Sequence, residues 1–108
     1  MDAYEIRIEA EDWEPGAWNP ADDNTEVNVT FADGTHWEAT FFAYANIATL
    51  VEQCRQTGAN LSGRYFWARD MILIEEINRE LIEEVIARLL ETGDFYEIFN
   101  CCDEADVC

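Results

Sequence analysis

The sequence contains no lysine, and the six basic residues that balance its 24 carboxylates are all arginines, at positions 7, 55, 64, 69, 79 and 88. The net charge is −18 over 108 residues. A protein that binds nucleic acid needs a basic patch that releases counterions from the phosphates, and this sequence offers none. We therefore expect no direct nucleic-acid binding. The partner that such a charge attracts, at rates that fall with added salt, is a basic protein.

Residues for nucleophilic or acid–base catalysis are equally scarce. His36 is the only histidine, Ser62 is the only serine, and no Gly-x-Ser-x-Gly motif surrounds that serine. Adjacent carboxylates occur at residues 22–23 and 75–76, without the spacing of a calcium-binding loop. We interpret His36 as structural, predict no cofactor, and expect that the protein is not an enzyme.

The four cysteines lack the paired spacing of a zinc site. Cys101, Cys102 and Cys108 form no Cys-x-x-Cys motif, and one histidine is too few to complete a ligand set, so we predict no metal. Cys54 lies on the apolar stripe of a predicted helix, where a small buried thiol is typical. The adjacent Cys101 and Cys102 are interpreted as incidental or prone to oxidation in air, and in a reducing cytoplasm they are expected to stay thiols.

Long apolar runs are absent, since none approaches the ~20 residues that span a bilayer, and we expect no membrane partner. The first residues, acidic from the second onward, lack the basic and apolar regions of a signal peptide. We expect a cytoplasmic protein with a single domain over residues 1–99. Residues 100–108 are predicted to form a mobile, acidic, cysteine-containing tail.

Alternating apolar and polar residues predict a β-hairpin over residues 26–32 and 35–42. A two-residue Asp-Gly turn would mix apolar and polar side chains on both faces of the sheet. A three-residue loop over 32–34, with its glycine in the left-handed conformation, pairs Val29 with Trp37 and gathers the apolar side chains on one face. We therefore predict the three-residue loop.

The most apolar stretch is RYFWARDMILIEEI at residues 64–77, interrupted only by Arg69 and Asp70. Apolar side chains on both alternating faces indicate a strand covered on both sides, or two strands that meet near the charged pair. Neither charged residue suits a tight turn, so we favour a single strand with a bulge there. Residues 4–8, which alternate apolar and charged side chains, predict a half-buried strand.

Two segments carry apolar residues at helical spacing. The first, over residues 46–57, has Asn46 as its predicted N-cap, and the second, over residues 78–93, starts at Asn78 and has a stronger stripe. A short last turn over residues 95–99 is expected to pack on the core. The fold class that follows is α+β: a mainly antiparallel sheet of four to five strands with two main helices packed on one face.

A long loop over residues 9–24 holds both prolines, two tryptophans and six carboxylates. Such a loop could bury aromatic rings against a partner while its acids select a basic one, or it could be a lid whose tryptophans complete the core. The acidic outer side of the second helix is the rival surface, with an ordinary solvated face as its alternative. The predicted partner-binding residues are Glu9, Glu11, Asp12, Trp13, Glu14, Trp18, Asp22, Asp23, Glu80, Glu83 and Glu84.

Three motifs resemble those of a group of small acidic bacterial proteins. They are Asp-Asn-x-x-Val-x-Val-Thr at residues 23–30, Phe-Phe-x-x-x-Asn-Ile at 41–47, and Thr-Gly followed by Tyr-Phe-Trp-x-x-Asp-Met within 57–71. The resemblance covers about residues 20–99. It implies an immunity-like protein, cytoplasmic and suited to neutralise a basic toxin such as a nuclease. It transfers no functional residue.

Two other functions stay open. A nucleic-acid mimic that blocks a restriction or CRISPR complex needs its carboxylates on one continuous face, because duplex DNA carries one charge per ~1.7 Å. A small enzyme or ligand-binding domain needs a concave pocket near Trp67, Arg69 and Asp70, lined by groups with perturbed pKa. The leading prediction is a non-enzymatic protein that binds and inhibits a basic partner.

Overall fold

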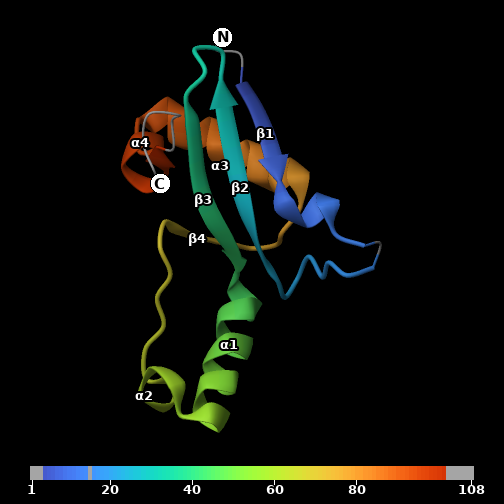
Figure 1. The fold of residues 1–108 in the computed structure, drawn as a ribbon, viewed down its shortest axis with the longest axis vertical. Coiled ribbons are helices and arrows are strands. Elements are labelled where there is room, and N and C mark those ends of the chain that lie inside the picture. Colours follow the sequence, from blue (N-terminus) through green and yellow to red (C-terminus); the bar gives the residue numbers. More distant parts are fainter. Residues whose placement is uncertain (1–3, 15, 102–108) are drawn as a thin grey trace.

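The computed structural model describes residues 4–14 and 16–101 (Figure 1). The strands are β1 (Tyr4–Ile8), β2 (Asn24–Phe31), β3 (His36–Ala43), β4 (Met71–Ile74) and β5 (Asn100–Cys101). The helices are a short 3-10 helix, η1 (Glu9–Asp12), and the α-helices α1 (Tyr44–Thr57), α2 (Ala59–Gly63), α3 (Arg79–Thr92) and α4 (Phe95–Ile98). A mainly antiparallel sheet with separate helices confirms the predicted α+β class.

All five strands belong to one sheet in the order β1-β2-β3-β4, and every pair except β3–β4 is antiparallel. The short β5 pairs with β3 at Trp37 and Glu38, outside the segment of β3 that pairs with β4. Asn100 and Cys101 therefore belong to the sheet, although the sequence assigned them to the start of a mobile tail. The rest of that predicted tail, residues 102–108, lies outside the part of the chain that the structure describes.

The β2–β3 hairpin has the predicted three-residue loop and register. Val27 pairs with Ala39, Val29 pairs with Trp37, and the loop closes on the N–H of Gly34, which donates to a carbonyl of β2. Gly34 has a φ of 90°, the left-handed region that this bulged turn requires. The gain from collecting apolar side chains on one face thus outweighs the usual two-residue preference of Asp-Gly.

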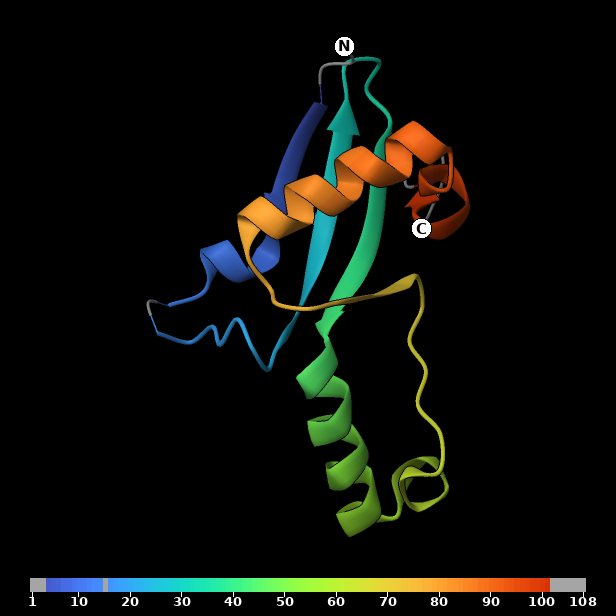
Figure 2. The ribbon, with the colours of Figure 1, turned by 180° about the vertical axis from the view of Figure 1, so that it is seen from behind.

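Helix α3 covers the apolar face of the sheet and supplies much of the core (Figure 2). Its Ile82 and Ile86 are fully buried, and each buried side chain of this size contributes about 1.5–3 kcal/mol. Asn78 caps the helix as predicted, since its Oδ1 accepts the backbone N–H three residues on at 2.7 Å. The predicted last turn also packs on the core: Phe95 and Phe99 are buried, with ring centroids 4.2 Å apart.

The apolar stretch over residues 64–77 is mostly not a strand. Only Met71–Ile74 pairs with β3, and the residues before it run outside the sheet with Tyr65 and Trp67 exposed. The single bulged strand was wrong, because the strand begins only after Asp70, which has a φ of 51°. The apolar run is not covered on both sides, since no described helix packs on the outer face of the sheet. β5 also occupies the remaining edge of β3.

Helix α1 differs from the prediction at its start and in its placement. It begins at Tyr44, directly after β3, and Asn46 lies buried within its first turn instead of capping it. Because β3 runs into the helix without a turn, α1 continues away from the end of the sheet and does not fold back onto it (Figure 1). Of the two long helices, only α3 packs on the face of the sheet. Gly58 ends α1 as predicted, with a φ of 83°.

Helices α1 and α2, with the segment that returns to β4, form a projection that we call the arm (residues 44–70). The other described residues are called the body. At the tip of the arm, Asn60, Leu61 and Ser62 form a left-handed turn with φ of 53°, 53° and 57°. Each left-handed residue other than glycine costs about 1–2 kcal/mol, so the tip is strained. The returning segment meets the sheet at Phe66, whose ring centroid lies 5.7 Å from that of a phenylalanine in β3.

Candidate functional site

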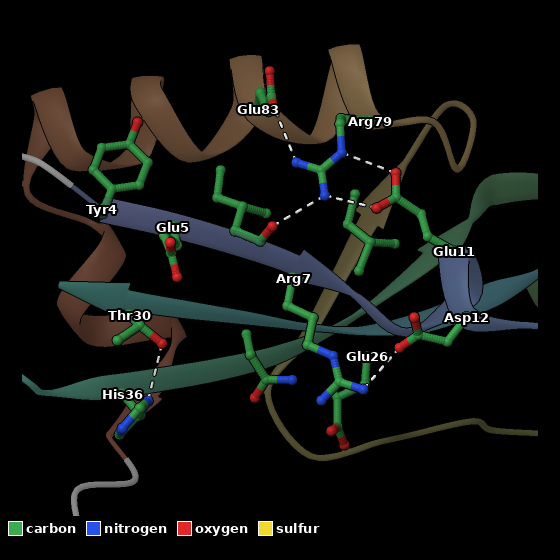
Figure 3. Close-up of a pocket in the computed structure, with 13 residues that line it drawn as sticks. Tyr4, Glu5, Arg7, Glu11, Asp12, Glu26, Thr30, His36, Arg79 and Glu83 are labelled. Carbon is green, nitrogen blue, oxygen red and sulfur yellow. Dashed lines mark hydrogen bonds and ion pairs between the residues drawn. The ribbon is translucent and has the colours of Figure 1, made fainter.

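The side chains that point away from α3 form an open face of the sheet. The alternation that buries apolar residues under α3 places polar residues of β1, β2 and β3 on the other side, where no described helix lies over them. A hollow of about 1070 Å³ follows this face and extends around the edge strand β1 to the first turn of α3 (Figure 3). The polar residues that line it are Glu5, Arg7, Glu11, Asp12, Glu26, Asn28, Thr30, His36, Arg79 and Glu83.

Arg79, the first residue of α3, holds three elements together at one side of this hollow (Figure 3). Its Nε and Nη2 donate to the two carboxylate oxygens of Glu11 at 2.8 and 2.7 Å, and its Nη1 donates to Glu83 at 2.9 Å. Nη2 also donates to the carbonyl of Ile6 on the edge strand at 3.0 Å. The planar guanidinium suits this two-point contact. We call this arrangement the Arg79 clamp; by occupying a carbonyl of β1, it also hinders pairing of that edge with another chain.

Both arginines of the hollow are already paired with carboxylates. The hydrogen bond from Arg79 lowers the pKa of Glu11, and the bonds to Glu11 and Glu83 raise the pKa of Arg79. On the open face, Nη2 of Arg7 donates to Asp12 at 2.7 Å, and this hydrogen bond raises the pKa of Arg7. The hollow therefore offers carboxylates to a partner but no unpaired arginine.

His36 and Glu38 lie on the open side of β3 and form no catalytic pair. Nδ1 of His36 lies 2.9 Å from the hydroxyl of Thr30 across the hairpin, in keeping with a structural histidine. Burial raises the pKa of Glu38, and the nearby charges of Glu26 and Asp70 raise it further. These three carboxylates border a hollow of about 150 Å³, whereas ligand pockets usually start at roughly 300 Å³.

The pocket predicted near Trp67, Arg69 and Asp70 is only partly formed. Arg69 and Asp70 line the hollow of about 150 Å³, but Trp67 does not, and its side chain is 68% exposed. A hollow of this size does not enclose a typical organic substrate. This part of the molecule therefore gives little support to the enzyme alternative.

The tryptophans of the loop over residues 9–24 serve the body. Trp13 and Trp18 are half-buried and pack against the core, as in the alternative in which the loop is a lid. Asp23 is used within the loop, where its carboxylate accepts the backbone N–H groups of Asn19 and Asn24. Pro15 lies outside the described residues. These side chains therefore stabilise the loop and the core, and they are not fully available to a partner.

Asp22 fastens the loop to the base of the arm. Its Oδ1 accepts from Nδ2 of Asn46 at 2.9 Å, and its Oδ2 accepts from the hydroxyl of Thr49 at 2.8 Å. Asn46 in turn accepts from Nδ2 of Asn24 at 2.9 Å, which explains why an asparagine is buried in the first turn of α1. The bond from Asn46, followed by that from Thr49, lowers the pKa of Asp22.

We expect Asp22→Asn to loosen the attachment of the arm, because an amide offers one acceptor oxygen where the carboxylate offers two. The pKa of Asp22 is lowered in the folded state, so its stabilisation is present above the unfolded pKa of ~3.9 and is lost as pH falls through the folded value. Thermal unfolding should give a lower midpoint for the variant at pH 7 and midpoints that converge as pH falls through the folded pKa of Asp22. Equal midpoints for the two proteins at pH 7 would show that the hydrogen bonds of Asp22 do not stabilise the attachment of the arm.

The remaining predicted carboxylates divide into two groups. Those in ion pairs with Arg7 or Arg79 are Glu11, Asp12 and Glu83. Those that are exposed and form no ion pair with another described residue are Glu9, Glu14, Glu80 and Glu84. Only the second group carries charge that no described arginine compensates.

Sequence reasoning missed the Arg79 clamp and the open-face carboxylates Glu5 and Glu26. The open-face residues had a signal, because they occupy the polar positions of alternating strands. Arg79 also precedes Glu83 by four residues, a favourable spacing on a helix. The contact between Arg79 and Glu11 joins residues 68 positions apart and left no local trace in the sequence.

Among the described residues, no group of three or more histidine, cysteine, aspartate or glutamate side chains is placed to hold a metal ion. Cys54, expected to be buried on α1, is a half-buried thiol, and Cys102 and Cys108 lie outside the described residues. Within the same part of the chain, no helix has the length and apolar character needed to cross a membrane.

Comparisons with protein-family models, curated proteins and solved structures found no match for this chain. A function must therefore be inferred from the sites themselves. Two features are available for that purpose: an open face rich in carboxylates and a projecting arm.

Proposed function

We propose that this protein is a non-catalytic binding protein that inhibits a basic partner, as an immunity-type protein that neutralises a basic toxin such as a nuclease. One observation carries the proposal: every arginine of the body is already paired with a carboxylate. The pairs are Arg7–Asp12, Arg79–Glu11, Arg79–Glu83 and Arg88–Glu91. The other described carboxylates of the body form no ion pair, so the body presents uncompensated negative charge.

These carboxylates give a basic partner two directions of approach. Glu5 and Glu26 lie on the open face along the hollow (Figure 3). Glu80 and Glu84 are exposed on α3, which covers the other side of the sheet. Charge of one sign steers an oppositely charged protein at rates that fall with ionic strength. The hollow adds a concave surface that a loop of the partner could enter, so we assign the inhibitory contact to the open face.

The proposal includes no reaction and places the protein in the cytoplasm. The hollow that borders Glu38 contains no serine, cysteine or histidine among its lining residues, and His36 bonds to Thr30. The hydroxyl of Thr30 and the imidazole of His36 are in contact, but among the described residues no third side chain bonds to the imidazole to orient it as a base. A cytoplasmic location fits the free thiol of Cys54, because that compartment keeps thiols reduced.

A nucleic-acid mimic is less well supported. It requires carboxylates along one continuous strip with the charge spacing of a duplex. The exposed carboxylates instead lie on the open face, on α3 and in other segments such as residues 75–76. The open face and α3 are on opposite sides of the sheet (Figure 2). A partner that bound on one side of the sheet would contact only part of the negative charge of the body.

The proposal is tested with two matched pairs of isosteric changes. One variant combines Glu5→Gln with Glu26→Gln on the open face, and the other combines Glu80→Gln with Glu84→Gln on α3. The probes are purified basic nucleases from the source organism, and the measurement is nuclease activity as the protein is added at low salt.

We expect the wild-type protein to inhibit at least one of these nucleases. The open-face variant should raise the inhibition constant about tenfold, equivalent to ~1.4 kcal/mol, and the α3 variant should raise it much less. If the wild-type protein inhibits no basic nuclease and captures no basic protein from the organism's lysate, the proposal fails. A larger effect of the α3 variant would move the contact to that side.

A further inference from the structure

We propose that the arm is a self-association surface, through which two copies of this chain pair with arm against arm. The inference is independent of the inhibitory function, because it concerns a different surface. The arm continues from the end of β3 and projects beyond the sheet (Figure 1). The base of the arm is tied to the body by Asp22, but most of its length extends away from the core.

The arm gathers most of the large apolar side chains that the structure leaves exposed. Their exposed fractions are 60% for Tyr44, 67% for Leu61, 50% for Tyr65 and 68% for Trp67. Among the described residues outside the arm, large apolar side chains of similar exposure are Leu73, in the adjoining β4, and Tyr96, in α4. A concentration of this kind on one projecting element marks an interaction surface.

Helix α1 also lacks the cover that its amphipathic sequence requires. The apolar stripe of α1 is only half-buried, and the one buried residue of the helix is Asn46. In α3, by comparison, the stripe includes two fully buried isoleucines. The short α2 packs against α1, since the α-carbon of Gly63 approaches Val51 and Arg55 closely. A helix with this pattern is stable when a further apolar surface covers the rest of its stripe.

The distribution of charge identifies the occupant as a second copy. Residues 44–70 contain three arginines and two carboxylates, a net of +1, so the rest of the −18 chain carries −19. Two bodies therefore repel each other strongly, whereas two arms, with a net charge of only +1 each, repel each other weakly. Arg64 and Arg69, which form no ion pair with described residues, both lie on the arm. Arg69 lies at the base of the arm, in the small hollow that Glu26, Glu38 and Asp70 also line, whereas Arg64 lies beside the tip. Arg64 is therefore the unpaired cation that is separated from the acidic body of its own chain.

A two-fold axis that pairs the arms antiparallel covers their apolar side chains and keeps the two acidic bodies apart. The tip of each arm, with Arg64 beside it, then lies near the acidic body of the other copy, while the two bodies are at opposite ends of the dimer. The principal extents of one copy are 46 × 30 × 26 Å, so this arrangement keeps the bodies well separated. It also covers the left-handed turn at Asn60, Leu61 and Ser62, where the side chain of Leu61 is largely exposed in a single copy.

The apolar area of the arm suits a weak dimer. A large aromatic side chain buries about 150–250 Å² when fully covered, so the half-exposed residues of the arm and Leu73 offer roughly 500 Å² per copy. Specific interfaces bury about 600–1,000 Å² per partner, and the stripe of α1 supplies the remainder. We expect dissociation in the micromolar range.

Sedimentation equilibrium of the full chain over a wide concentration range tests the proposal. The wild-type protein should approach twice the 12.5 kDa of one chain. Trp67→Ser or Leu61→Ser should weaken the dimer about thirtyfold, the effect of losing an interface hot spot. Tyr96→Ser, a change at a body residue that is 52% exposed, is the matched control and should leave the dimer unchanged.

A second comparison tests the role of charge. Arg64→Glu and Arg88→Glu make the same change in net charge, but only the first lies on the arm, so only the first should weaken the dimer beyond the general repulsion. Hydrogen exchange of the wild-type protein gives a measure that needs no variant: exchange of residues 59–70 should slow as concentration rises. A wild-type monomer at every concentration, an open-ended polymer, or equal effects of arm and body variants would each overturn the inference.

Discussion

Replacing Arg79 with methionine is expected to destabilise the body by about 2 kcal/mol. The change keeps an apolar stem but removes every bond of the Arg79 clamp, which leaves Glu11 unpaired and the carbonyl of Ile6 without its donor. Hydrogen bonds to charged groups contribute about 1.5–3 kcal/mol, and we take a value near the lower end because solvent screens side chains that are 39% and 35% exposed. Thermal unfolding at pH 7 should show a fall in Tm of about 10 °C.

The matched control is Arg88→Met, on the same helix and with the same change in charge. The pair of Arg88 with Glu91 is 3.5 Å long and well exposed, so its loss should cost less than about 0.5 kcal/mol.

The stabilisation by the Arg79 clamp depends on pH. The pKa of Glu11 is lowered in the folded state, so the clamp stabilises the protein above the unfolded pKa of ~4.3, and this stabilisation is lost as pH falls through the folded value. Equal effects of the two variants at pH 7 would contradict the clamp.

Gly63→Ala is expected to open the hairpin between α1 and α2 at a cost of about 3 kcal/mol. A methyl group on Gly63 would lie 2.7 Å from the carbonyl oxygen of Val51 and 2.8 Å from Cγ of Arg55. The φ of 80° at this position adds the left-handed penalty of about 1 kcal/mol to the cost of the overlap. Because the arm is peripheral, the effect should appear as faster hydrogen exchange over residues 59–63, with α3 unchanged.

Gly58→Ala separates the two contributions to this effect. Gly58 has a φ of 83°, but a methyl group there would meet no heavy atom within 4 Å. This control should therefore cost only the left-handed penalty, about 1 kcal/mol. If both alanine variants accelerate exchange equally, the close approach of α2 to α1 plays no part in holding the arm.

Local patterns in the sequence predicted the elements whose partners are close in the chain. The hairpin register follows from alternation and one left-handed glycine, and α3 follows from its cap at Asn78 and its apolar stripe. In both cases propensity, capping and burial favour the same structure. These elements form the scaffold, and the α+β class follows from them.

The exposure of the arm could not be predicted from local patterns. It follows from the absence of any other described segment that packs over the exposed apolar side chains of the arm. The apolar run over residues 64–77 and the stripe of α1 both suggested burial, yet Tyr65 and Trp67 are exposed. Periodicity shows that a surface is apolar, but it does not show whether the same chain covers it. The cap expected at Asn46 failed for a similar reason, since that side chain is held by Asp22 from a distant loop.

The candidate site was predicted in character but only partly in detail. Composition indicated a carboxylate-rich surface without a basic patch, and the three arginines of the body are all paired with carboxylates. Several of the predicted carboxylates, however, are held by Arg7, Arg79 or Asn46, through contacts between residues far apart or from different elements. Alternation in the strands could have assigned Glu5 and Glu26 to the polar face, but the hollow that they line is formed only when the strands and α3 come together.

Thermal stability as a function of salt tests most directly whether the body is an uncompensated acidic surface. Crowded carboxylates repel one another, and screening shortens from about 30 Å at 0.01 M to about 3 Å at 1 M ionic strength. We predict that Tm rises by at least about 5 °C over this range in both NaCl and KCl. A variant that combines Glu5→Gln, Glu26→Gln, Glu80→Gln and Glu84→Gln should show a smaller rise. A Tm that stays flat or falls with salt would mean that the charges are already compensated, and would contradict the proposed basis for binding a basic partner.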